Sequence, residues 1–166
     1  CVGSHKLADL RPRPLMYYRK HVAHTIAPRA STPAFDFGRL FHCLALEGEA
    51  VTQSRFVVVP ADAPTRPQRR HLEAKKPSAA TIEAGQWWQE FDAAHAGMEI
   101  TTAENIAIAW KMVESIRSKP AAAKLLERGK PEVTFRHPME AFTVQARVDW
   151  FDADDAAGPL CINLKT

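Results

Sequence analysis

Three polar residues near the end of the sequence have types and a spacing that suit the binding of a divalent metal ion. Asp149 is followed fourteen residues later by the triplet Asn163-Leu164-Lys165. Two carboxylates on adjacent strands can share a hard cation through oxygen, and the cation lowers the pKa of a bound water. A lysine two residues after the second carboxylate shares its strand face and can orient that water or stabilise a transition state at phosphorus. With an aspartate in place of Asn163, this would be the pattern of a metal-dependent phosphodiesterase.

The same spacing has a simpler explanation. An aspartate and a lysine on neighbouring strands often meet by chance in a surface salt bridge, which contributes about 0–1 kcal/mol. By itself the spacing favours this salt bridge, and the metal-site hypothesis therefore depends on further residues.

Two segments of alternating hydrophobicity, 142–150 and 160–165, are expected to position these residues as a β-hairpin around the acidic linker 151–159. With the apolar faces together, the opposite face carries Arg147, Asp149, Asn163 and Lys165. Gln145 shares the polar face of the first strand. A preceding strand, 132–136, places Glu132 on its polar face, and we treat Gln145 and Glu132 as candidate supporting residues.

One predicted helix, about 32–47, brings a histidine beside its buried stripe. Thr32 can cap this helix, with Pro33 in the first turn, and Gly48 ends it. His42 lies about 100° around the helix from the stripe, with small residues, Gly38 and Ala45, one turn away on either side. The stripe consists of Phe37, Leu40, Phe41 and Leu44. A histidine at such a boundary is more often structural than a ligand, so periodicity alone favours a structural role.

The rest of the chain is expected to form the scaffold. Helices are predicted from about Leu15, over 79–96, over 103–117 and from Pro120 to Gly129, with an edge strand over 55–60. Thr101 and Glu104 have the spacing of a capping box. The Ile106, Ala109, Trp110 and Val113 stripe of the 103–117 helix is predicted to face the core. The Trp87-Trp88 pair is expected in the core rather than on a base-stacking surface.

A proline-rich loop, 61–78, carries most of the clustered positive charge of a chain whose net charge is only +3. The cluster consists of Arg66, Arg69, Arg70, Lys75 and Lys76. A solvated loop is the favoured interpretation, and a loop that contacts DNA phosphates is the alternative.

Bulk properties predict one domain. The 166 residues can bury a core. The three cysteines are far apart and include no Cys-x-x-Cys pair, so a reduced, cytoplasmic chain is the simplest account. No apolar run reaches the ~18 residues of a membrane span. Gly3-Ser4-His5 resembles a cloning scar, which gives a tag remnant over 1–5 and a single domain over 6–166. Because the sequence ends at Thr166, directly after the strand with Lys165, we expect C-terminal structure to be missing.

The motifs described above, together with other segments in the same order along the chain, resemble the RecE-type (exonuclease VIII) nucleases of phages and prophages, within the PD-(D/E)XK superfamily. The resemblance covers most of the chain. Its most specific parts are the Gly-x-x-x-His helix and the two strand motifs. The segments are Phe37–Glu47, Arg55–Pro60, Ala74–Ser78, Trp87-Trp88 with Phe91, Glu132–Thr134, Ala146–Trp150 and Asn163–Thr166.

The resemblance implies an α+β (α/β) fold with a mixed central β-sheet flanked by helices. It also implies a 5′-to-3′ exonuclease on double-stranded DNA that depends on Mg²⁺ (or Mn²⁺), serves recombination with a single-strand annealing protein and assembles as a homo-oligomeric ring. By position, His42, Asp149 and Asn163 would contact the metal, Leu164 would offer its backbone carbonyl, and Lys165 would be the catalytic lysine. Glu132 matches a recurrent acid of the family.

Asn163 departs from the family pattern, which has aspartate there. The amide keeps one acceptor oxygen but loses the negative charge, so we expect weak or absent cleavage that Asn163→Asp restores. An engineered change, a natural inactive homologue and a site that tolerates asparagine are all compatible with the sequence. A nuclease-like module that only binds DNA or protein is the rival hypothesis, and a nuclease of the same superfamily in repair or CRISPR-associated trimming is a third.

Overall fold

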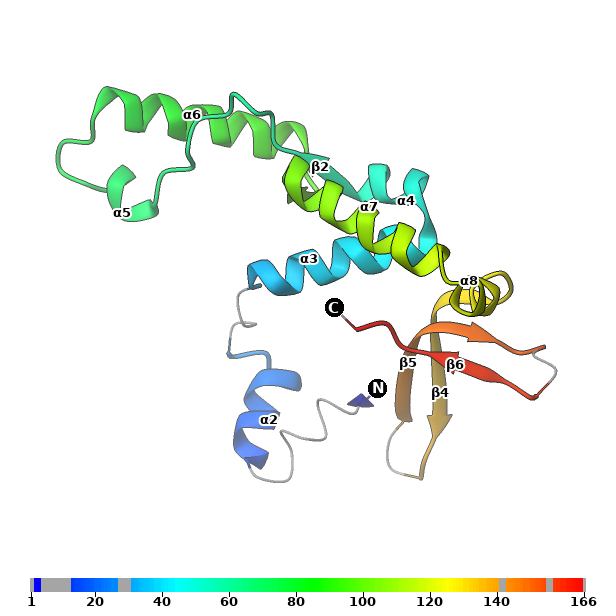
Figure 1. Ribbon diagram of the computed structural model, residues 1–166. Coiled ribbons are helices and arrows are strands. Elements are labelled where there is room, and N and C mark those ends of the chain that lie inside the picture. Colours follow the sequence, from blue (N-terminus) through cyan, green and yellow to red (C-terminus); the bar gives the residue numbers. More distant parts are fainter. Residues whose placement is uncertain (1, 4–12, 27–30, 141–142, 155–156, 166) are drawn as a thin grey trace.

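The chain folds into a mixed α+β structure, in which a helical layer stands beside a small sheet (Figure 1). The computed structural model describes residues 2–3, 13–26, 31–140, 143–154 and 157–165. Its helices are α2 (Pro14–His21), α3 (Pro33–His42), the π-helix η1 (Cys43–Glu47), α4 (Glu49–Arg55), α5 (Arg69–Leu72), α6 (Ala79–Ala94), α7 (Ala103–Arg117) and α8 (Pro120–Leu125). Its strands are β1 (Val2–Gly3), β2 (Phe56–Val58), β3 (Glu99–Thr101), β4 (Lys130–Pro138), β5 (Thr143–Asp152) and β6 (Leu160–Ile162).

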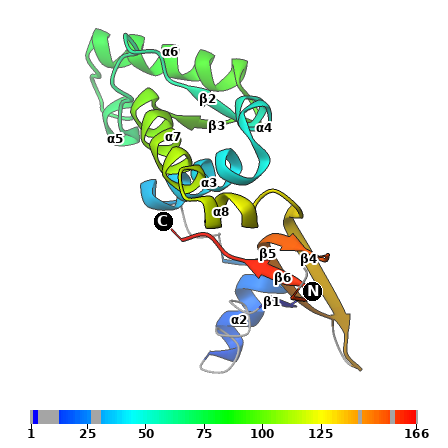
Figure 2. The same cartoon turned by 45° about the vertical axis from the view of Figure 1, so that its right-hand side comes forward.

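The core lies where α3 and η1 pack against α7. The predicted α3 stripe is confirmed, since Leu40, Phe41 and Leu44 are buried and Phe37 packs against them. The α7 stripe is confirmed as well, with Ala109 and Val113 buried and the other two members packed against the cluster. Phe56 of β2 completes this core. In Figure 2 the α3, α4 and α7 layer lies between the α5–α6 arm and the β4–β5–β6 sheet.

The helix predicted over 32–47 begins as expected but changes its winding. Thr32 caps it by accepting a hydrogen bond from the Phe35 N–H at 3.3 Å. After His42 the α-helix continues as a π-helix to Glu47, a change that the sequence analysis did not predict. Gly48 ends it with φ of 89°. Short π-segments inside α-helices are frequent at functional sites, and this one begins directly after the candidate histidine.

A second, two-stranded sheet joins β2 and β3 in parallel. The predicted strand over 55–60 is confirmed in a shorter form, whereas β3 was not predicted. The predicted capping box places the helix cap one residue too early. Because Thr101 ends β3 and is buried, Thr102 is the residue that caps α7, accepting from the Asn105 N–H at 3.1 Å.

The helices α5 and α6 form an arm that extends away from the β4–β5–β6 sheet (Figure 1). The predicted helix over 79–96 is confirmed, and the loop predicted over 61–78 contains the short helix α5. Trp87 and Trp88 lie half-buried in a cluster of their own with Phe91 and not in the main core. Their expected place in the core is therefore wrong. The Trp88 indole N–H donates to the Pro64 carbonyl at 2.8 Å, which ties the loop to α6.

The larger sheet contains the predicted hairpin, but its second strand ends at Ile162 instead of Lys165. β5 pairs antiparallel with β4 on one side and with β6 on the other, and β1 pairs with β5 in parallel through Val2 and Gly3. Trp150 lies opposite Ile162, and Asp152 lies opposite Leu160. β5 thus extends two residues into the predicted linker, where Asp152 is buried. Phe142, the predicted first residue of the hairpin, lies outside the described residues.

The turn from α8 into β4 packs against the sheet. α8 ends at Leu125, four residues before the predicted stop at Gly129, which has φ of 117°. A Cβ atom on Gly129 would lie 2.6 Å from the Phe151 carbonyl oxygen and 2.8 Å from the Trp150 indole nitrogen. The absence of a side chain therefore lets the turn approach β5. Across the described ranges, the helices are too short or too polar to cross a membrane.

Candidate metal centre

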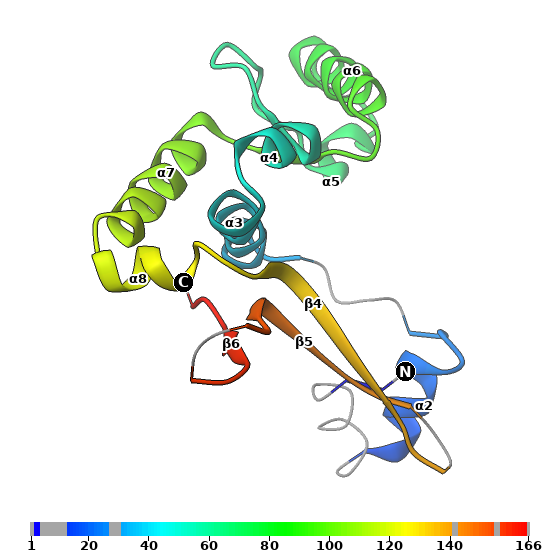
Figure 3. The ribbon, with the colours of Figure 1, turned by 90° about the vertical axis from the view of Figure 1, so that its right-hand side faces the viewer.

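Three side chains from distant parts of the sequence meet between α3 and the sheet. His42, Glu132 and Asp149 each offer one ligand atom, and these atoms all lie within 4.8 Å of one another. His42 Nδ1 is 3.7 Å from Asp149 Oδ2, and both side chains are about one-quarter exposed or less, at 25% and 20%. The last helical residue of α3 and two neighbouring strands supply this group. The helix and both strands are visible side by side in Figure 3.

The strand register brings the two carboxylates together. Pro131 pairs with Trp150 and Val133 with Val148, so Glu132 lies directly across from Asp149. Glu132 has a φ of 56°, in the left-handed region that residues other than glycine rarely adopt. Such backbone conformations cluster at functional sites because the surrounding structure must hold them. Sequence alternation predicted a strand here but could not predict this local geometry.

The hairpin also orients Asp149. The Leu164 N–H donates to Asp149 Oδ2 at 2.8 Å, and the Asp149 N–H donates to Asn163 Oδ1 at 3.4 Å. After β6 the chain runs toward α3 (Figures 1 and 2), and the Leu164 side chain packs against the core there. Packing of Leu164 therefore fixes the N–H that holds the Asp149 carboxylate. The contact of Leu164 with Asp149 is through its N–H, and its predicted carbonyl role stays untested.

The three side chains open into a cleft of about 830 Å³. Its lining includes the predicted residues His42, Glu132, Asp149, Leu164 and Lys165, together with Arg147. Three of the four residues expected on one polar face thus line the cleft: Arg147, Asp149 and Lys165. Of the described residues, Asn163 and Gln145 are not part of the lining. Asn163 is exposed beside it, and Gln145 lies further along β5 opposite Arg136.

The basic cluster predicted to contact DNA lies on the α5–α6 arm and contributes nothing to the lining of the cleft among the described residues. Arg66 forms an ion pair with Asp92 and stacks over the Trp88 ring at 4.2 Å. Arg69 pairs with Glu73 at 2.6 Å. Arg70, Lys75 and Lys76 are exposed on the same arm. The structure therefore separates this cluster from the candidate metal centre.

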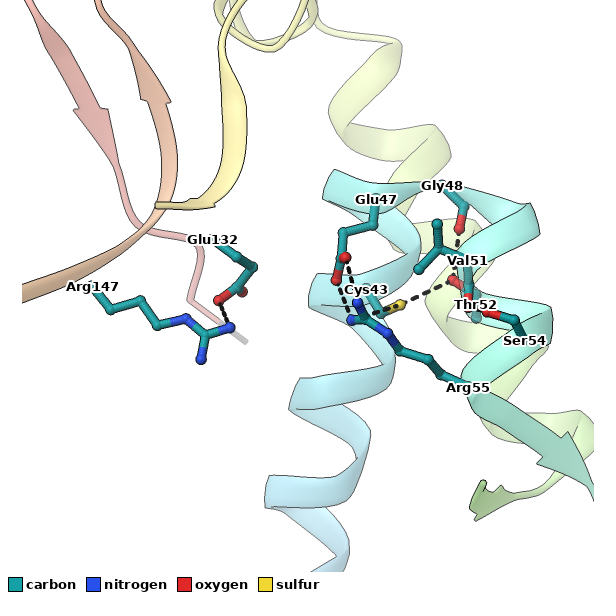
Figure 4. Close-up of polar contacts among 9 residues, drawn as sticks. All are labelled: Cys43, Glu47, Gly48, Val51, Thr52, Ser54, Arg55, Glu132 and Arg147. Carbon is teal, nitrogen blue, oxygen red and sulfur yellow. Dashed lines mark hydrogen bonds and ion pairs between the residues drawn. The ribbon is translucent and has the colours of Figure 1, made fainter. Parts of the chain in front are cut away.

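Two arginine–carboxylate pairs on the helical wall of the cleft were missed by the sequence analysis. Arg39 pairs with Glu99 of β3 at 2.8 Å. Arg55 pairs with Glu47 through two bonds of 2.5 and 2.8 Å, and this bonding raises the pKa of Arg55. Figure 4 shows the pair at the end of η1. Arg39 and Glu99 lie far apart in the chain, and Glu47 and Arg55, eight residues apart, belong to different helices, so no helix or strand period pairs them.

The same wall includes a buried thiol. Cys43 is 4% exposed, and the Thr52 hydroxyl lies 3.5 Å from its sulfur. Burial raises the pKa of the Cys43 thiol, so it behaves as a small apolar core residue rather than as a nucleophile.

The donor set fits a divalent cation. One imidazole nitrogen and two carboxylate oxygens suit Mn²⁺, and carboxylates with water suit Mg²⁺. The half-buried positions leave the cleft side open for water and substrate. Comparison of the chain with models of known protein families, with curated proteins and with solved structures gives no match.

Proposed function

We propose that the chain is a metal-dependent phosphodiesterase that acts on nucleic acid. The observation that carries this proposal is the convergence of His42, Glu132 and Asp149, with their ligand atoms within 4.8 Å of one another in an open cleft that Lys165 also lines. A surface salt bridge, the simpler explanation of the Asp149–Lys165 spacing, requires no histidine and no second carboxylate at the same point.

Each residue has a distinct role in this proposal. His42, Glu132 and Asp149 hold the cation, which when bound supplies an activated water and offsets charge at the scissile phosphate. The Leu164 N–H keeps the Asp149 carboxylate turned toward the cleft. Lys165 donates from the rim of the cleft to the attacking water or to a phosphate oxygen. Asn163 provides an amide oxygen where a carboxylate would strengthen the site.

The finer assignment is a 5′-to-3′ exonuclease on duplex DNA with a PD-(D/E)XK core. It is supported by the order of the elements: a helix that carries His42, then the β4–β5–β6 meander, which carries Glu132 and Asp149 and is followed by Lys165. The sequence resemblance described above and the cleft between helix and sheet agree with this order.

A second candidate is a nuclease-like module that binds DNA without cutting it. Two observations favour it. Asn163 supplies no charge, and its side chain is already used as an acceptor for the Asp149 N–H. Glu132 is already neutralised by an ion pair with Arg147.

The test combines metal binding with cleavage. Calorimetric titration with Mn²⁺ should show one site in the chain as it stands, and Asp149→Ala should abolish it. Asp154→Ala removes an exposed acid that follows β5; it is the matched control and should leave the titration unchanged. Asn163→Asp should then degrade a linear end-labelled duplex in Mg²⁺. Metal binding without cleavage by that variant would favour the second candidate, and no metal binding would refute the first.

A further inference from the structure

Arg147 occupies an unusual position among the cations of the cleft. Its guanidinium forms an ion pair with Glu132, one of the three candidate ligands (Figure 4). The Arg147 side chain is 61% exposed, whereas that of Glu132 is 24% exposed. The arginine therefore reaches in from the open side of the cleft and covers a carboxylate that lies deeper.

The other two cleft arginines are bound differently. Arg39 pairs with Asp36 and Glu99, and Arg55 pairs with Glu47. None of these acids belongs to the candidate ligand group. Within the described residues, Arg147 is thus the arginine of the cleft whose ion-pair partner is itself a candidate ligand.

We propose that Arg147 stands in for the metal in the metal-free site, and that metal binding releases its guanidinium to bind a phosphate of the substrate. This inference rests on the proposed function. Arg147 is then a substrate-positioning residue whose availability depends on the metal. The cleft would bind the phosphate backbone tightly only when the metal is in place.

The charges favour the exchange. A guanidinium cannot lose its proton in a protein, so Arg147 cannot neutralise itself when a divalent cation takes Glu132. Two cations on one carboxylate repel each other, and the exposed side chain is free to move into the cleft. The arginine side of this pair is open to solvent, which weakens the attraction, so the metal can displace the guanidinium at small cost.

The strand geometry places the released guanidinium where it can contact a second phosphate of the substrate. Arg147 and Asp149 are two residues apart on β5, so they project from the same face about 6–7 Å apart along the strand. A phosphate beside the one held at the metal lies within reach of that position. The planar guanidinium can then bond two phosphate oxygens at once.

The test compares Arg147→Gln with Arg136→Gln, which removes an exposed arginine of β4 outside the cleft lining. Mn²⁺ affinity is measured by calorimetry. Affinity for a duplex with uncleavable phosphorothioate linkages is measured by fluorescence anisotropy, in Mn²⁺ and in EDTA. Arg147→Gln should bind Mn²⁺ about two- to fivefold more tightly, because the competing cation is gone.

The same variant should bind the duplex about tenfold more weakly in Mn²⁺, with the slope of log affinity against log salt reduced by about one. In EDTA its duplex affinity should equal that of the unaltered chain. Arg147→Lys should retain part of the Mn²⁺-dependent binding, since it keeps the charge but not the bidentate geometry. Arg136→Gln should show none of the Mn²⁺-specific effects.

Two results would overturn the inference while leaving the proposed function intact. One is an Mn²⁺ affinity that Arg147→Gln leaves unchanged or weakens. The other is an equal loss of duplex affinity in Mn²⁺ and in EDTA, which would make Arg147 an ordinary surface contact. Failure of the unaltered chain to bind Mn²⁺ at all would instead refute the proposed function together with this inference.

Discussion

Asn163→Asp is the most informative single change in this chain, because its effect on stability and on metal binding should have opposite signs. The Asn163 amide oxygen accepts the Asp149 N–H at 3.4 Å, and an aspartate can keep this bond. The shape of the site is therefore retained. What changes is the charge, since a second carboxylate is placed directly across the β5–β6 pair from Asp149.

The size of the effect follows from that placement. Opposed cross-strand side chains lie about 5 Å apart, where two like charges repel by about 0.8 kcal/mol in water and by about 3 kcal/mol at an effective dielectric constant of about 20. Because residue 163 is exposed and the Asp149 side chain is 20% exposed, the lower half of this range applies, about 1–2 kcal/mol. For a chain of this length each kcal/mol lowers the melting temperature by about 2–4 °C, which gives a fall of about 2–8 °C in EDTA.

Divalent metal should favour the stability of the Asn163→Asp variant, opposite to the effect of the added charge in EDTA. If the added charge tightens the Mn²⁺ dissociation constant about tenfold, saturating metal adds about 1.4 kcal/mol of stability beyond what the unaltered chain gains. The rise in melting temperature on adding Mn²⁺ should then exceed that of the unaltered chain by about 3–6 °C.

Differential scanning calorimetry in EDTA and in millimolar Mn²⁺ measures the melting temperature under both conditions. Gln145→Glu is the control, because it adds the same charge to β5, the strand of Asp149, but opposite Arg136. Gln145→Glu should not lower the melting temperature in EDTA, and it should not increase the rise in melting temperature that Mn²⁺ causes. An Asn163→Asp variant that melts with the unaltered chain in both buffers would refute the placement of residue 163 beside the metal.

Further predictions concern the scaffold of the site. Gly129→Ala should lower the free energy of unfolding in urea by about 2–4 kcal/mol, because it adds a collision with β5 to a strained φ. Gly158→Ala has a similar φ of 110° but no described atom within 4 Å, so it should cost only about 1 kcal/mol; equal costs would contradict the close approach of the turn. Thr102→Ala should cost about 1 kcal/mol through loss of the α7 cap, which urea titration can measure. Peptide mapping of thiol alkylation should show Cys161 reacting quickly and Cys43 slowly, and comparable rates would contradict the burial of Cys43. Because burial raises the pKa of Cys43 in the folded state, the unfolded chain loses this proton first, and the free energy of unfolding should fall as pH rises above the unfolded thiol value of about 8.5.

The sequence alone was enough to predict the elements that local periodicity and capping control. The buried stripe of α3, the extent of α7 and the β5–β6 hairpin follow from the spacing of apolar residues, and Thr32 and Gly48 mark their helix ends by side-chain chemistry. The placement of Asp149 and position 163 on one face was also predicted, because a one-residue slip of the hairpin would turn its apolar side chains to the other face.

Tertiary structure decided the composition of the site. The position of His42 near the two carboxylates depends on how α3 packs against the sheet, and the place of Glu132 depends on a positive φ that no sequence period encodes. Arg147, Arg39 and Arg55 acquired their partners Glu132, Glu99 and Glu47 through contacts between different elements of the fold. Charge clustering pointed instead to the α5–α6 arm, because composition records how many charges a segment carries and only the fold determines which of them face the same space.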